Sequence, residues 1–101
     1  MFGRFNRADF SGADLSEATC APFGKTGFIE HIWRTEFLGA KLDGTRFAKA
    51  DLTHALFSFA SLKGADLSGA ILRDADLSSA DLTGADVTGA DVSGADLDGV
   101  I

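Results

Sequence analysis

The chain has 101 residues, 46% of them hydrophobic, with one Cys, one Pro and no Tyr, which fits one small domain covering residues 1–101. The lone Cys20 excludes an internal disulfide, and the lack of an 18-residue apolar run argues against a membrane-spanning helix. The formal net charge of -6 argues against direct nucleic-acid binding, which requires a surplus of Lys and Arg for phosphate contacts.

A five-residue pattern begins at Gly3 and runs through a first block, residues 3–22. Its pentads GRFNR, ADFSG, ADLSE and ATCAP have Phe5, Phe10, Leu15 and Cys20 as their third residues. Because third residues are predicted to be buried, Cys20 is expected to be a small core hydrophobe rather than a reactive thiol.

The frame then breaks once, because 17 residues separate Cys20 from Phe37 and 17 is not a multiple of five. A loop or bulge is therefore predicted at about residues 23–34. Two interpretations of its aromatic side chains are open. Either the aromatic side chains pack back over the edge of the neighbouring repeats, or Phe28 and Trp33 anchor a partner on a protruding recognition loop. The register between the two blocks is left undecided by the spacing.

The second block, residues 35–99, contains thirteen pentads in one unbroken frame, ending in repeats such as ADLSG and ADVTG. In an α-helix five residues rotate the chain by about 500°, so the third residues would form no apolar stripe. In a flat strand they would alternate between the two faces. A chain that turns a corner once per pentad instead buries every first and third residue, and its coils stack through strand-like hydrogen bonds.

The pentads resemble those of the pentapeptide-repeat family, which read Ala, Asp or Asn, Leu or Phe, and two variable residues; the match covers 85 of 101 residues. The resemblance implies an all-β solenoid, a right-handed quadrilateral parallel β-helix with four pentads per coil and about four coils. Residues 20 apart then stack inside. The predicted core is Phe37, Leu42, Phe47, Leu52, Phe57, Leu62, Leu67, Leu72, Leu77, Leu82, Val87, Val92 and Leu97.

No catalytic, metal-binding or cofactor-binding residues are identified. His31 and His54 are isolated, and Ser and Thr residues have no neighbouring base. The Gly-Ala-Asp runs lack the spacings of phosphate-binding loops and of calcium-loaded β-helices. A non-enzymatic protein without a cofactor is therefore predicted.

The acidic end of the chain has two interpretations. Residues 64–101 contain 8 Asp and only one cation, Arg73. The outward Asp carboxylates either accept hydrogen bonds from turn amides and solvate the rod, or form an array that imitates DNA. Some pentapeptide-repeat proteins bind DNA gyrase and related topoisomerases in the second way, although this chain is about half their usual length. The residues that would carry this surface are Asp66, Asp76, Asp86 and Asp96.

The exposed apolar positions and the coil ends suggest a protein partner. Leu56 and Phe59 face outward on one side, either as scattered surface hydrophobes or as a lateral contact. Neither end of the repeats has a capping helix, so a homodimer through uncapped coil ends, a fragment of a longer chain, or coverage by the interrupting segment is expected. The predicted function is a rigid protein-interaction scaffold with an unidentified partner. No signal peptide or membrane segment is recognised, so a cytoplasmic location is expected.

Overall fold

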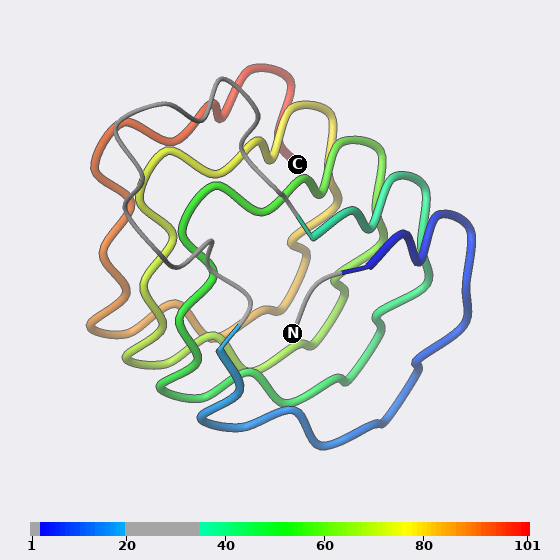
Figure 1. The fold of residues 1–101 in the computed structure, drawn as a ribbon, viewed down its shortest axis with the longest axis horizontal. Coiled ribbons are helices and arrows are strands. Elements are labelled where there is room, and N and C mark those ends of the chain that lie inside the picture. Colours follow the sequence, from blue (N-terminus) through cyan, green and yellow to red (C-terminus); the bar gives the residue numbers. More distant parts are fainter. Residues whose placement is uncertain (1–2, 20–34) are drawn as a thin grey trace, which may run out of the picture.

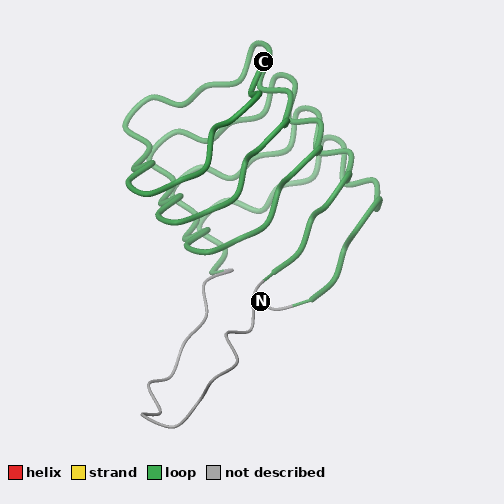
Figure 2. Ribbon diagram, turned by 90° about the horizontal axis from the view of Figure 1, so that it is seen from above, coloured by secondary structure: helices red, strands yellow, loops and turns green. Residues whose placement is uncertain are grey.

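The computed structural model describes residues 3–19 and 35–101, which wind into a stack of coils (Figure 1). Figure 2 shows successive coils lying side by side along one axis. The described residues form neither a helix nor a continuous strand; their β-structure consists of isolated parallel bridges, with one bridging residue in each pentad. Each bridge lies at the second residue of a pentad, the third residue follows, and the last two residues form a turn. The chain therefore turns a corner once per pentad, as the five-residue period predicts.

Bridges within residues 35–101 join residues 20 apart, as in Glu36 with Leu56, so four pentads complete one turn. We name each side of the coil after one of its second residues. The Leu56 side stacks Arg4, Glu36, Leu56, Asp76 and Asp96; the Ser61 side stacks Asp9, Lys41, Ser61 and Asp81; the Asp66 side stacks Asp14, Arg46, Asp66 and Asp86; the Ile71 side stacks Thr19, Asp51, Ile71 and Asp91.

The first block stacks on the second with a different spacing. Arg4 bridges Glu36, which is 32 residues away in the sequence, twelve more than in a regular coil. The Thr45 hydroxyl also ties the two blocks together by donating to the Phe10 carbonyl at 2.8 Å. The interruption is thus an insertion between Thr19 and Thr35, and the register left open by the sequence is settled. The predicted loop at about 23–34, with Phe28, Trp33 and the neighbouring Cys20, lies outside the described residues.

Two kinds of backbone hydrogen bond hold the stack together. The Leu67 amide donates to the Asp86 carbonyl in the next coil at 2.7 Å, and the Asp86 amide donates back to Ala65 at 2.9 Å. Within the turn, the Ala70 amide donates to the Leu67 carbonyl at 3.0 Å. The residue before Ala70 is Gly69 with φ of 66°, the conformation that a type II turn requires at this position.

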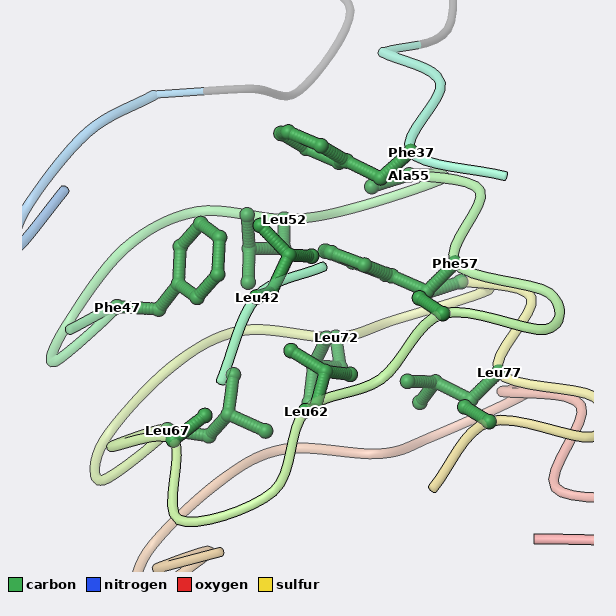
Figure 3. Packing of buried hydrophobic residues seen from close by; sticks show 14 of the residues in the cluster. Phe37, Leu42, Phe47, Leu52, Ala55, Phe57, Leu62, Leu67, Leu72 and Leu77 are labelled. Atoms are coloured by element: carbon green, nitrogen blue, oxygen red, sulfur yellow. The ribbon is translucent and has the colours of Figure 1, made fainter. Parts of the chain in front are cut away.

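The third residues fill the interior, as predicted (Figure 3). The Phe5 ring stacks on Phe37 at a centroid distance of 5.5 Å, and Phe37 stacks on Phe57 at 5.1 Å. Small Ala side chains at the first positions are buried beside them, so the corners close tightly. The predicted core residues found fully buried are Phe37, Leu42, Phe47, Leu52, Phe57, Leu62, Leu67, Leu72 and Leu77.

The prediction of a buried core was wrong for the last coil. Val87, Val92 and Leu97 are 49%, 42% and 45% exposed, and Leu82 is only partly buried against the core. Their places in the pentads are as expected, but no described coil stacks on their far side. Burial of a third residue depends on the neighbouring coil as well as on the frame.

Candidate functional site

The Asp residues at second positions hold the turns of their own pentads. The Asp66 carboxylate accepts the amide of Ser68 at 2.9 Å and the hydroxyl of the same residue at 2.6 Å. Equivalent amide bonds are made at nine positions: Asp9, Asp14, Asp51, Asp66, Asp76, Asp81, Asp86, Asp91 and Asp96. An Asx-type bond of this kind fixes a turn locally. These are the hydrogen bonds from turn amides to Asp carboxylates that the first interpretation of the acidic end describes.

The same hydrogen bonds hold several carboxylates in their charged form. Bonds from a Ser or Thr two residues later lower the pKa of Asp9, Asp14, Asp81 and Asp86. Asp91 shows the largest effect, because the Ser93 hydroxyl and the Arg73 guanidinium both donate to it and lower its pKa to about 2. Carboxylates that resist protonation in this way are poorly suited to act as general acids near neutral pH.

The four Asp residues predicted as a DNA-mimicking surface lie in two separate pairs. Asp66 bridges Asp86 on the Asp66 side, and Asp76 bridges Asp96 on the Leu56 side. These two sides are two pentads apart around a four-sided coil, so they face in opposite directions. The structure therefore brings each pair together but does not bring all four carboxylates onto one face.

Cations pair with carboxylates of the next coil on other parts of the surface. Arg73 Nε lies 2.6 Å from Asp91 Oδ2, and Lys63 Nζ lies 3.7 Å from Asp81 Oδ2. The sequence suggested an isolated His54, but its Nε2 lies 3.9 Å from Asp74 Oδ2. The 20-residue separation of these two residues, at equivalent turn positions, was the signal that would have revealed the pair. Exposed pairs of this type contribute little to stability.

Among the described residues, Phe59 has the most exposed large apolar side chain. It is 74% exposed and adopts a φ of 61°, at a turn position that other pentads often give to Gly. Leu56 and Leu38 are partly buried on the same side. The two outward hydrophobes expected on one side, Leu56 and Phe59, thus lie there together with a third, Leu38, that the sequence analysis did not single out.

Other kinds of site are not formed by the described residues. Residues 3–19 and 35–101 contain no group of three or more His, Cys, Asp or Glu side chains placed to hold a metal ion. The same part of the chain has no buried side-chain nitrogen or oxygen without a hydrogen-bond partner. It also contains no helix long and apolar enough to cross a bilayer.

Comparisons with solved structures identify several similar proteins. A pentapeptide repeat protein from the thylakoid lumen of Arabidopsis thaliana is 37% identical, with a TM-score of 0.63, and the match covers 96% of this chain and 65% of that one. A pentapeptide repeat protein from Nostoc PCC 7120 is 33% identical, with a TM-score of 0.59 and coverages of 93% and 64%. HetL, a pentapeptide repeat protein from the same Nostoc strain involved in heterocyst differentiation regulation, is 32% identical, with a TM-score of 0.53 and coverages of 95% and 50%.

The chain therefore spans about two thirds or less of the length of these relatives. A comparison with curated protein sequences gives no match. The family description "Pentapeptide repeats" matches eight copies over residues 32–58 and 60–99. Members of that family fold as quadrilateral β-helices, and the bridges of this chain define the same four-sided coil. On the repeats, the coil and the solved relatives together, the chain belongs to the pentapeptide-repeat family.

Proposed function

We propose that this chain is a non-enzymatic, rigid scaffold of about four right-handed coils that binds another protein. The observation that supports the proposal is that inward and outward positions alternate in a fixed way within each pentad. First and third residues fill the core, whereas the second, fourth and fifth residues project from a frame held by inter-coil hydrogen bonds. A frame of this kind presents a fixed array of side chains and loses little conformational entropy on binding.

The partner in this proposal is a protein rather than a nucleic acid or a membrane. The net charge of -6 would repel a phosphate backbone. The four sides also differ in chemistry, since the Leu56 side carries the exposed Phe59 ring and the Ile71 side carries the Arg73–Asp91 ion pair. Different sides can therefore recognise different protein surfaces. A cytoplasmic location and an association through the coil ends also stay predictions.

We do not favour the alternative, a DNA-mimicking acidic protein that binds gyrase. Its four candidate carboxylates lie in two pairs on opposite sides, and each accepts a hydrogen bond from its own turn. The alternative predicts inhibition of gyrase supercoiling that is lost when Asp66, Asp76, Asp86 and Asp96 are all changed to Asn. Inhibition that survives this change would remove these residues from the interaction.

Site-specific photo-crosslinking in cells tests the scaffold. A photoreactive amino acid is placed at one exposed position per side: Ser79 on the Leu56 side, Lys41 on the Ser61 side, Thr88 on the Asp66 side and Ser93 on the Ile71 side. We expect one defined protein to be captured from one side or from two adjacent sides, and not from the others. Equal capture from all four sides would argue against a specific scaffold. A catalytic turnover that one substitution abolishes would contradict the non-enzymatic proposal.

A further inference from the structure

The Leu56 side has an ordered charge distribution from one end to the other. Arg4 and Arg7 lie in the first coil, and Asp96 and Asp98 lie at the opposite end. Backbone hydrogen bonds confirm the stacking of the fourth and fifth residues of this side, since they join Arg7 to Leu38, Gly39 to Ser58, Phe59 to Ser78 and Ser79 to Asp98. This side is therefore basic at one end and acidic at the other.

The charges at both ends are available for an external partner. Arg7 and Asp98 form no ion pair with any described residue, and the same holds for Asp76 and Asp96. Arg4 lies 3.1 Å from Glu36 but its side chain is 82% exposed. The acidic end of this side thus has no cation of its own within residues 3–19 and 35–101.

The middle of the same side is apolar. Leu56 is the third of five stacked second residues, and Phe59 belongs to the same pentad. Phe59 is 74% exposed and has a φ of 61°, a backbone conformation that is unfavourable for a residue with a β-carbon. Six other non-Gly residues share this positive φ, so the exposure of the ring is what distinguishes Phe59. An exposed aromatic side chain buries little apolar area in its own coil and gains most from a contact outside it.

We propose that the Leu56 side is a homodimer interface in which two copies pack side by side with their rods antiparallel. A twofold axis in the interface, perpendicular to the rod at the level of Leu56, places Phe59 against Phe59 of the second copy. The same axis places Arg4 opposite Asp96, and Arg7 opposite Gly99, next to Asp98. Opposite charges at both ends and apolar groups at the centre make this side complementary to itself, as a twofold interface requires.

One like-charge contact occurs twice in this arrangement, since Glu36 of each copy lies opposite Asp76 of the other. Within each copy Glu36 pairs with Arg4 and accepts a further bond from Asn6 Nδ2 at 3.3 Å, so Arg4 is shared between Glu36 and Asp96 of the second copy. The interface is also small. Five levels at ~4.8 Å make it roughly 20 Å tall and ~10–12 Å wide, well below the ~800 Å² per partner of stable complexes. We therefore expect a weak dimer, seen at high protein concentration and low salt.

Sedimentation velocity of the full chain over a concentration series tests this proposal, which goes beyond the scaffold function and does not depend on its partner. The wild type is expected to dimerise, and added salt is expected to weaken the dimer. Phe59→Gly, which removes the apolar centre and the unfavourable φ, is expected to weaken it by about tenfold or more. The matched control is Lys49→Gly, because Lys49 has a φ of 59° at the same turn position on the Asp66 side. This control is expected to dimerise as the wild type does.

Charge exchange distinguishes the antiparallel arrangement from other contacts. Arg7→Glu and Asp98→Lys are each expected to weaken the dimer, and the double variant is expected to restore it, because each copy then offers the reversed pair. A wild type that stays monomeric at all concentrations overturns the proposal, and so does a double variant that is not rescued. A dimer that survives Phe59→Gly but is lost in Leu97→Asp also overturns it, since the contact then lies at the coil end.

Discussion

The rings of Phe37 and Phe57 stack with their centroids 5.1 Å apart and their planes inclined by 7°, although a whole coil separates the two residues in sequence. Both side chains are fully buried. Replacing Phe57 with Ala leaves a cavity between two coils, and we expect unfolding by urea to show a loss of about 3–5 kcal/mol.

Two further variants calibrate this prediction. Phe57→Leu is expected to lose much less stability, because Leu77 fills the equivalent place in the next coil of the same column. Val87→Ala is expected to cost below about 1 kcal/mol, since Val87 is 49% exposed on the last coil. Equal losses for Phe57→Ala and Val87→Ala would show that stacking between coils does not determine the stability of this core.

The inward positions were predictable because the pentad frame alone decides which side chains share the interior. Leu67 and Phe57 were placed correctly on that basis. The register of the first block was not predictable, because a spacing of 17 residues is compatible with more than one insertion. Exposure of Leu97 was missed because burial depends on a neighbouring coil, which the frame does not describe.

The surface was less predictable than the core for a physical reason. Outward side chains obey no packing rule, so their contacts follow from stacking distances that only the structure provides. The Asp66–Asp86 pair could be predicted from the 20-residue period. Its separation from the Asp76–Asp96 pair follows from the position of the two pairs, which lie two pentads apart on a four-sided coil and so on opposite sides. The backbone conformation of Phe59 has no sequence signal beyond its place where other pentads have Gly.

Removal of the unfavourable backbone conformation at Phe59 is expected to stabilise the protein. Gly adopts a positive φ freely. Because Phe59 is 74% exposed, Phe59→Gly removes few packing contacts. We expect a gain of about 1 kcal/mol, or roughly 4–8 °C in Tm, in thermal unfolding at a concentration where the chain is monomeric. Ser79→Gly, with a φ of 58° in the next coil, serves as the control and should gain a similar amount. A lower Tm for Phe59→Gly alone would mean that the ring stabilises its own coil.

Two glycines separate the cost of backbone conformation from the cost of a steric clash. A β-carbon on Gly64, with φ of 66°, would have no atom within 4 Å, so Gly64→Ala is expected to lose about 1 kcal/mol from the positive φ alone. A β-carbon on Gly94, with φ of 69°, would collide with the carboxylate of Asp74. The Asp74 carboxylate is exposed and can rotate away, so Gly94→Ala is expected to lose only slightly more stability than Gly64→Ala in urea unfolding. The double variant Gly94→Ala with Asp74→Ala should recover the difference, and no recovery would exclude the clash as its cause.

Acid is expected to destabilise the coil through the Asp carboxylates that hold the turns. Five of these carboxylates, those of Asp9, Asp14, Asp81, Asp86 and Asp91, have pKa values in the folded chain below the ordinary value of 3.8, and the pKa of Asp91 is about 2. A folded-state pKa below the unfolded one means that the stabilisation is complete above pH ~4 and is lost as the pH falls from about 4 to 2. Urea midpoints measured across this range should fall for the wild type, and fall less for Asp91→Asn, which has no charge to lose at that position. The matched control is Asp98→Asn, because the Asp98 carboxylate forms no ion pair among the described residues. A urea midpoint that stays constant between pH 4 and pH 2 would contradict the role of these carboxylates in holding the turns.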